Sequence, residues 1–162
     1  MTKILLISVK PRFARALLEG RKTVEVRRRF PDLPVGTVVV IYASSPERAV
    51  LGAVRLKYVM RVDPNEVWGL HAGDIEIDEH ALIEYLAGAT ESTLLKVESP
   101  EVWARPVSLA TLRDTLGLDA PQSFRYINSE QVALMRDLGK GVEIAHDGKA
   151  RRRAQADPLN AH

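Results

Sequence analysis

Residues 20–43 read GRKTVEVRRRFPDLPVGTVVVIYA and contain the two segments that decide the fold. In 22–28, apolar and charged residues alternate, so they fall on opposite faces of the expected strand. The apolar face carries Val24 and Val26, and the polar face carries Thr23, Glu25 and Arg27. The second segment, 37–43, is apolar throughout, which is typical of a strand buried on both faces. Together they predict a sheet with a buried centre and a charged surface or cleft along one strand.

Apolar periodicity and turn residues predict further elements on both sides of this stretch. Further strands are expected at 3–9, 49–62, 92–98 and 101–108. Helical segments are expected at 11–19, 64–69, 79–87, 109–116 and 129–138, with Leu82, Ile83 and Leu86 facing inward. Gly52 interrupts the longest strand, as glycines do at bulges and barrel corners. We therefore expect a mixed α/β domain of the α+β kind over 1–138, a small β-barrel with flanking helices.

The composition is that of an ordinary globular domain. The 162 residues are 46% hydrophobic and 27% charged, which is enough for one domain with its own core. The absence of cysteine excludes a disulfide framework, a thiolate zinc site and a cysteine nucleophile. The four histidines lack metal-ligand spacing, so neither a metal nor another cofactor is expected. Because no apolar run suits a signal peptide or approaches the ~20 residues of a membrane span, we expect a cytoplasmic protein without a membrane partner.

The net charge of +2 conceals an uneven distribution along the chain. Residues 1–62 contain 13 Lys and Arg against 4 Asp and Glu, whereas residues 63–101 contain 1 against 10. This asymmetry is typical either of packed segments that neutralise each other or of a surface that attracts a polyanion. Residues 139–162 lack an apolar period and include three consecutive arginines, so a disordered basic tail is expected there.

Three short motifs occur in a fixed order along the chain. They are Gly20-Arg21-Lys22-Thr23, then Tyr42-Ala43-Ser44-Ser45-Pro46 followed by Gly52, then Pro121-Gln122-Ser123-Phe124-Arg125-Tyr126. With the order of predicted elements over residues 3–127, they make the chain similar to the ASCH branch of the PUA-like superfamily. The resemblance implies a pseudo-barrel with a cleft between barrel and helices. Domains similar to it bind RNA or modified nucleosides, and some act on RNA as enzymes.

The polar residues of these motifs are the candidate ligand-binding residues. They are Arg21, Lys22, Glu25, Arg27, Tyr42, Ser44, Ser45, Gln122, Ser123 and Arg125. An amine and a guanidinium can bind a phosphate or a base while a carboxylate accepts from a base amine, and a tyrosine ring can stack on a base. The alternative is structural: an ion-pair ladder on a solvated face, a core position for Tyr42, and turn capping by the residues after Pro121.

Lys22 and Glu25 are the candidate catalytic residues. The Gly-Arg-Lys-Thr turn also resembles that of small bacterial N4-acetylcytidine amidohydrolases, which implies a catalytic role for Lys22. Their nucleophilic threonine stands three residues after the lysine, where this chain has Glu25, and a carboxylate needs a different mechanism. Thr23 is at another step of the strand. The acidic residue of that branch would correspond to Glu79 or Glu84.

The sequence is consistent with three functions. The first is an RNA- or nucleotide-binding domain with a cationic polar cleft. The second is a metal-independent hydrolase of the same fold, either a ribonuclease or an amidohydrolase of a modified nucleoside, in which Lys22 polarises the substrate or transfers a proton. The third is a protein-protein interaction module in which acidic and basic parts of two copies meet. The pattern does not separate RNA from DNA and carries no information on oligomeric state.

Overall fold

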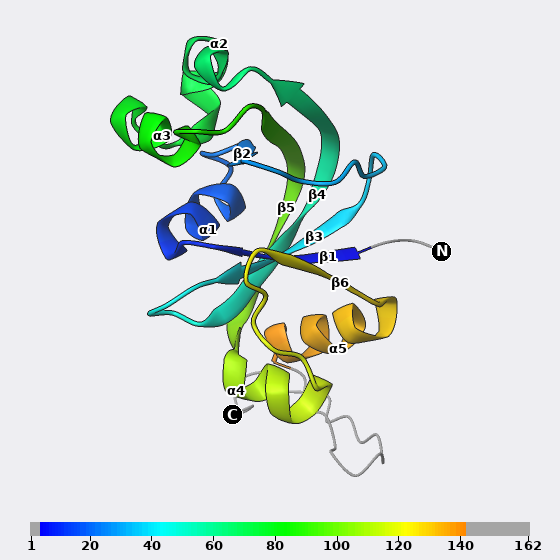
Figure 1. Cartoon of the computed structure of the whole chain (residues 1–162). Helices are drawn as coiled ribbons and strands as arrows, with labels where there is room; N and C mark the ends of the chain where they lie inside the picture. The colour runs from blue at the N-terminus through cyan, green and yellow to red at the C-terminus, as the bar shows by residue number, and fades with distance from the viewer. Residues whose placement is uncertain (1–3, 142–162) are drawn as a thin grey trace.

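The computed structural model describes residues 4–141, which form one curled six-stranded sheet with helices around it (Figure 1). The strands are β1 (Ile4–Val9), β2 (Val24–Arg27), β3 (Val38–Ala43), β4 (Ala49–Val62), β5 (Ser92–Ser108) and β6 (Phe124–Ile127). Their order is β2-β5-β4-β3-β1-β6, and every neighbouring pair is antiparallel except β1 and β3. The sheet is a half-barrel with β2 at one edge and β6 at the other, so the expected fold class is confirmed.

Helical segments cover the sheet at its centre and at both ends of the long β4–β5 hairpin (Figure 1). They are α1 (Pro11–Leu18), η1 (Pro64–Glu66), α2 (Val67–Ile75), α3 (Glu79–Leu86), α4 (Leu109–Thr111), the π-helical turn η2 (Leu112–Leu116) and α5 (Ser129–Gly139). The segment from η1 to α3, called the helical insertion below, lies at one end of the hairpin, and α4 and α5 lie at the other. Within residues 4–141, no helix is both long and apolar enough to cross a bilayer.

Three apolar clusters hold these layers together. Alternate residues of β1 face opposite ways: Leu5 and Ile7 pack in a cluster with α1, whereas Ile4 and Leu6 pack in a second cluster with α5. β3 is buried along its whole length, as the unbroken apolar run 37–43 predicts. The third cluster joins β2 to the helical insertion. Both faces of the central strands are therefore covered, which explains their continuous apolar sequence.

The two long strands bend through irregularities in their pairing. At Gly52 the register of β4 against β5 shifts, which confirms the predicted bulge. The prediction of two separate strands at 92–98 and 101–108 is wrong, because β5 runs without interruption through Ser99 and Pro100. The pairing shifts opposite them, and Ser99 adopts a positive φ of 54°. A bulge thus accommodates the proline, which cannot donate to a regular ladder.

Other differences from the sequence expectations have local causes. β6 was not expected because only four residues, Phe124–Ile127, follow the polar turn, and it is a short edge strand with two exposed residues. Ile83 is 59% exposed rather than inward, since Leu82 and Leu86 alone make the buried stripe of α3. The helix expected at 64–69 continues to Ile75. The expected tail, 139–162, lies outside the described residues beyond position 141.

We predict that Gly52→Ala lowers the free energy of unfolding by about 2 kcal/mol or more. A Cβ at this position would lie 2.2 Å from the backbone oxygen of Glu101, so the two strands would have to separate. Gly69→Ala in α2 is the matched control, because a Cβ there meets no atom within 4 Å and alanine favours a helix by about 1 kcal/mol over glycine. Urea denaturation measures both, and equal effects would contradict the prediction.

Candidate functional site

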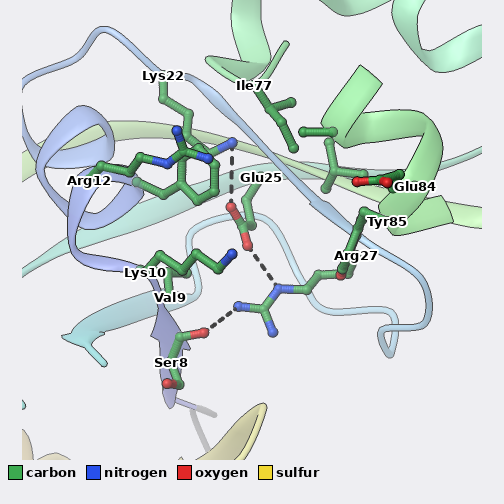
Figure 2. Close-up of a pocket in the computed structure, with 13 residues that line it drawn as sticks. Ser8, Val9, Lys10, Arg12, Lys22, Glu25, Arg27, Ile77, Glu84 and Tyr85 are labelled. Atoms are coloured by element: carbon green, nitrogen blue, oxygen red, sulfur yellow. Dashed lines mark hydrogen bonds and ion pairs between the residues drawn. The ribbon is translucent and has the colours of Figure 1, made fainter. Parts of the chain in front are cut away.

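A cleft of about 520 Å³ opens between β2, the start of α1 and helix α3 (Figure 2). Its lining from β1 and α1 is Ser8, Val9, Lys10, Arg12 and Phe13. The segment of β2 contributes Lys22, Glu25, Val26 and Arg27, and the helical insertion with the turn inside it contributes Ile77, Ala81, Glu84 and Tyr85. The cleft therefore joins three parts of the chain that are distant in sequence.

A row of three buried charged side chains forms the floor of the cleft, and we call it the floor row. Lys22, Glu25 and Arg27 are 3%, 7% and 8% exposed. Glu25 lies between the two cations: its Oε2 accepts from Arg27 Nε at 2.9 Å, and its Oε1 is 3.6 Å from Lys22 Nζ (Figure 2). Burying one charge alone is costly, and a row of alternating charges compensates that cost.

The alternation of β2 places two members of the floor row. Val24 and Val26 pack in the apolar cluster with the helical insertion, so Glu25 and Arg27 point the other way, as the sequence predicts. Lys22 precedes the strand, so the alternation of side chains along β2 does not fix its direction. Its ammonium donates to the carbonyl of Ile75, the last residue of α2, and lies 4.8 Å from the centre of a phenyl ring in α1.

Arg27 bridges the open side of the half-barrel. Its Nη1 donates to Ser123 Oγ at 3.1 Å, and its Nη2 donates to the carbonyl of Ser8 at 2.9 Å. Ser8 in turn donates its backbone N–H to the carbonyl of Ser123. Since β2 and β6 are the two edges of the sheet, a guanidinium rather than a backbone ladder joins them. We call this line between β2 and the β1–β6 pair the seam.

Burial shifts the pKa values of two titratable groups that face the cleft. It lowers the pKa of Lys22, although the neighbouring Glu25 carboxylate opposes the shift. The Lys22 ammonium is therefore a stronger proton donor than an exposed lysine. Burial also raises the pKa of Tyr85 on the opposite wall, with a smaller opposing effect of Arg27. The Tyr85 hydroxyl is consequently a hydrogen-bond donor throughout the neutral range.

The basic first third of the chain and the acidic middle contact each other beside the cleft. Arg21 pairs with Glu76 at 2.7 Å, and Arg28 donates to the carbonyls of Tyr85 and Ala87 at the end of α3. A cation at this position suits the negative end of the helix. Arg28 therefore helps to hold the helical insertion over β2. Part of the charge asymmetry along the chain is thus neutralised by contacts within the domain.

The structure divides the sequence-predicted site residues into two groups. Lys22, Glu25 and Arg27 line the cleft, and Ser123 bonds to Arg27 at the seam. The other predicted residues do not line the cleft. Arg21 is exposed and paired with Glu19 and Glu76, and Tyr42 is 3% exposed in the second core cluster. Ser44 and Ser45 are in the turn after β3, and Gln122 and Arg125 are exposed around the start of β6. The site is therefore narrower than the motifs suggest.

Among the lining residues that sequence reasoning did not predict are Lys10, Arg12, Phe13 and Tyr85. The available signal was a Lys-Pro-Arg step between a buried strand and a helix, which places two cations at a helix start. For Tyr85, we find no local signal.

Three residues compared with the amidohydrolases lie in different places. Glu84 lines the cleft, and Glu79 lies in a separate hollow. The Thr23 hydroxyl accepts from Lys96 at 3.1 Å and is not part of the cleft lining. Among residues 4–141, no group of three or more His, Asp or Glu side chains is arranged to hold a metal ion.

Comparison with known proteins identifies the class. The sequence model of the ASCH domain matches residues 7–102, and the chain belongs to the ASCH domain family. Over 140 residues it is 31% identical to a protein of Zymomonas mobilis subsp. mobilis named an ASCH domain-containing ribonuclease, with 85% of this chain and 93% of the relative covered.

Solved structures agree with this assignment. A crystal structure of ASCH from Zymomonas mobilis has a TM-score of 0.78 at 28% identity, covering 84% of this chain and 95% of that one. A protein from Agrobacterium tumefaciens has a TM-score of 0.55 at 13% identity, covering 85% of this chain and 93% of that one, and shares the fold.

We predict that Arg27→Lys lowers the free energy of unfolding by about 2 to 4 kcal/mol, because one ammonium cannot make both bonds across the seam, to Ser8 and Ser123, and also keep the bond to the buried Glu25. Arg15→Lys is the control, since Arg15 makes an exposed pair with Glu47 that is worth about 1 kcal/mol at most. Urea denaturation compares the two variants. Two equally small effects would show that Arg27 does not hold the seam.

Proposed function

We propose that this chain binds single-stranded RNA in the cleft, with phosphate at the rim and a base above the floor row. The observation that carries the proposal is a buried arginine that still has donors available. A guanidinium has five N–H donors, and Arg27 uses three of them, on Glu25, Ser8 and Ser123. Lys22 uses one of its three, on Ile75. The floor therefore offers several N–H groups to an anionic or carbonyl oxygen.

The rim supplies the cations that a phosphate needs. Lys10 and Arg12 are exposed at the start of α1, where the cleft opens. Helix α1 has no side-chain cap from Lys10 and no acidic residue in its first turn. Its N-terminal end is therefore electropositive and adds to the two side-chain charges. Both effects favour a backbone phosphate at this rim.

The walls and the floor suit an unpaired base. Phe13 from α1 and Tyr85 from α3 line the cleft on different helices. The Arg12 guanidinium and the Lys22 ammonium already lie over the Phe13 ring, so Tyr85 is the ring on which a base would stack. Aromatic side chains bind splayed-out bases by stacking, and a carboxylate between them can accept from an exocyclic amine. Glu25 is the carboxylate in the floor. A duplex cannot present a base in this way, which is why the proposal names a single strand.

The binding test is a titration of fluorescent single-stranded RNA at two salt concentrations. Wild-type binding should weaken as salt rises, and Lys10→Ala or Arg12→Ala should each weaken binding and reduce the salt slope by about 1. Lys57→Ala is the matched control, because Lys57 is an exposed cation on β4 outside the cleft lining. Salt-independent binding, or an equal loss in the Lys57 variant, would contradict the proposal.

A second candidate function is metal-independent RNA cleavage, favoured by the relative that is named a ribonuclease. In such a reaction the 2′-oxygen attacks the neighbouring phosphorus and loses its proton to a base, while the 5′-oxygen leaves and gains a proton. A 2′,3′-cyclic phosphate and a free 5′-hydroxyl result. Glu25 would accept the first proton, Lys22 would supply the second, and Arg27 would stabilise the charge on phosphorus.

The cleavage test separates the charge of Lys22 from its acidity. Lys22→Arg keeps a cation but removes a usable proton donor, since arginine does not deprotonate in proteins. We expect at least about a 100-fold loss of single-stranded RNA cleavage in buffer with chelator, with RNA affinity retained. Lys57→Arg should cleave as wild type does. Full activity in Lys22→Arg, or cleavage that depends on an added divalent metal, would refute this role.

A further inference from the structure

A row of aromatic rings follows the seam away from the floor row. The guanidinium of Arg27 lies 5.8 Å from the centre of the Phe30 ring. The Phe30 and Phe124 rings are 4.8 Å apart, and the Phe124 and Tyr126 rings meet edge to face at 6.0 Å. Each ring therefore contacts the next, and the row links the cleft floor to Tyr126.

Tyr126 lies on the side of the sheet that carries the cleft. Phe124 and Tyr126 are two residues apart in β6, so their side chains leave the same face. Their register partners in β1, Ile7 and Leu5, pack in the cluster with α1, and α1 also forms a wall of the cleft. The rings of β6 thus face inward along the seam and not toward α5.

Exposure changes along the row. Phe30 is buried and Phe124 is partly buried, whereas Tyr126 is 46% exposed. Tyr126 is therefore the most solvent-exposed of the three rings, and its neighbour Phe124 holds it in place. A ring held in this way loses little conformational freedom when a base stacks on it.

The distance to the cleft suits consecutive nucleotides of one strand. Ser123, which bonds to Arg27, is three residues before Tyr126, and three residues of strand span ~10 Å. A strand whose base occupies the cleft can place a nearby base over Tyr126 without leaving the seam. Stacking on tyrosine tolerates any base and requires that the base be unpaired.

We infer that the seam beside β6 is a second nucleotide-binding site, in which Tyr126 stacks an unpaired base of the strand that enters the cleft. This inference rests on the proposed RNA binding and extends it. The ligand is then a single strand of several nucleotides and not an isolated nucleotide. Tyr126 determines how strongly length contributes to affinity.

The test compares adenosine monophosphate with an oligoadenylate of about six nucleotides, a length within the range that such grooves hold. Tyr126→Leu keeps an apolar side chain and removes the ring. We expect it to weaken oligoadenylate binding about fivefold or more and to leave binding of the monophosphate unchanged. Tyr58→Leu is the matched control, because Tyr58 is a 41% exposed tyrosine on β4 that makes no ring contact within the described residues.

The binding results distinguish failure of the second site from failure of the proposed function. Unchanged oligoadenylate affinity in Tyr126→Leu, an equal loss in Tyr58→Leu, or a parallel loss of monophosphate binding would overturn the second site and leave RNA binding in the cleft intact. Wild-type protein that binds neither ligand would overturn the proposed function itself. If Tyr126→Leu does not fold, Tyr126→Trp replaces it: the introduced indole should be quenched by oligoadenylate and not by the monophosphate, and an absence of quenching would overturn the inference.

Discussion

The carboxylate of Glu25, placed between two buried cations, is the interaction on which the rest of this structure depends. Neither Lys22 nor Arg27 could be buried without it, because an unpaired charge in the interior is strongly destabilising. Each cation also reaches a different part of the chain: Lys22 bonds to the end of α2, and Arg27 bonds to Ser8 and Ser123. One carboxylate thus fixes the helical insertion and the seam together.

A sheet that does not close into a barrel can offer side-chain hydrogen-bond donors to a ligand at its open side. In a closed barrel, the backbone groups of every strand pair with those of its neighbours, and no strand edge remains. Here the edges β2 and β6 are joined by side chains, whose donors are not all used. The cleft therefore lies where the sheet is incomplete, and α1 and α3 form its walls. The same incompleteness leaves Tyr126 of β6 exposed at the far end of the aromatic row.

Much of the fold could be predicted because its signals are local. The alternation of 22–28 placed Glu25 and Arg27 on one face, and Gly52 marked the bend in β4. The lining from α1 and α3 could not be predicted in this way, because it depends on how helices distant in sequence pack against β2. Tyr42 illustrates the same limit: its motif adjoins the barrel, but strand parity turns the ring into the core of the opposite face. β6 was missed because its four residues are too few to show an alternation, although Phe124 and Ile127 pack against the two core clusters.

The pairing of β1 with β6 has a consequence for the order in which the chain can fold. β1 begins at Ile4, and its partner in β6 is Ile127, so the first strand of the sheet is completed by the last. Contacts between such distant residues carry a large loop-closure cost and form late. On a ribosome, which releases the N-terminus first, β1 would pair with β3 and then keep one edge open until β6 emerges. The residues that line the cleft, from Ser8 to Tyr85, are all synthesised earlier, whereas Ser123 can reach Arg27 and close the seam only when β6 is present.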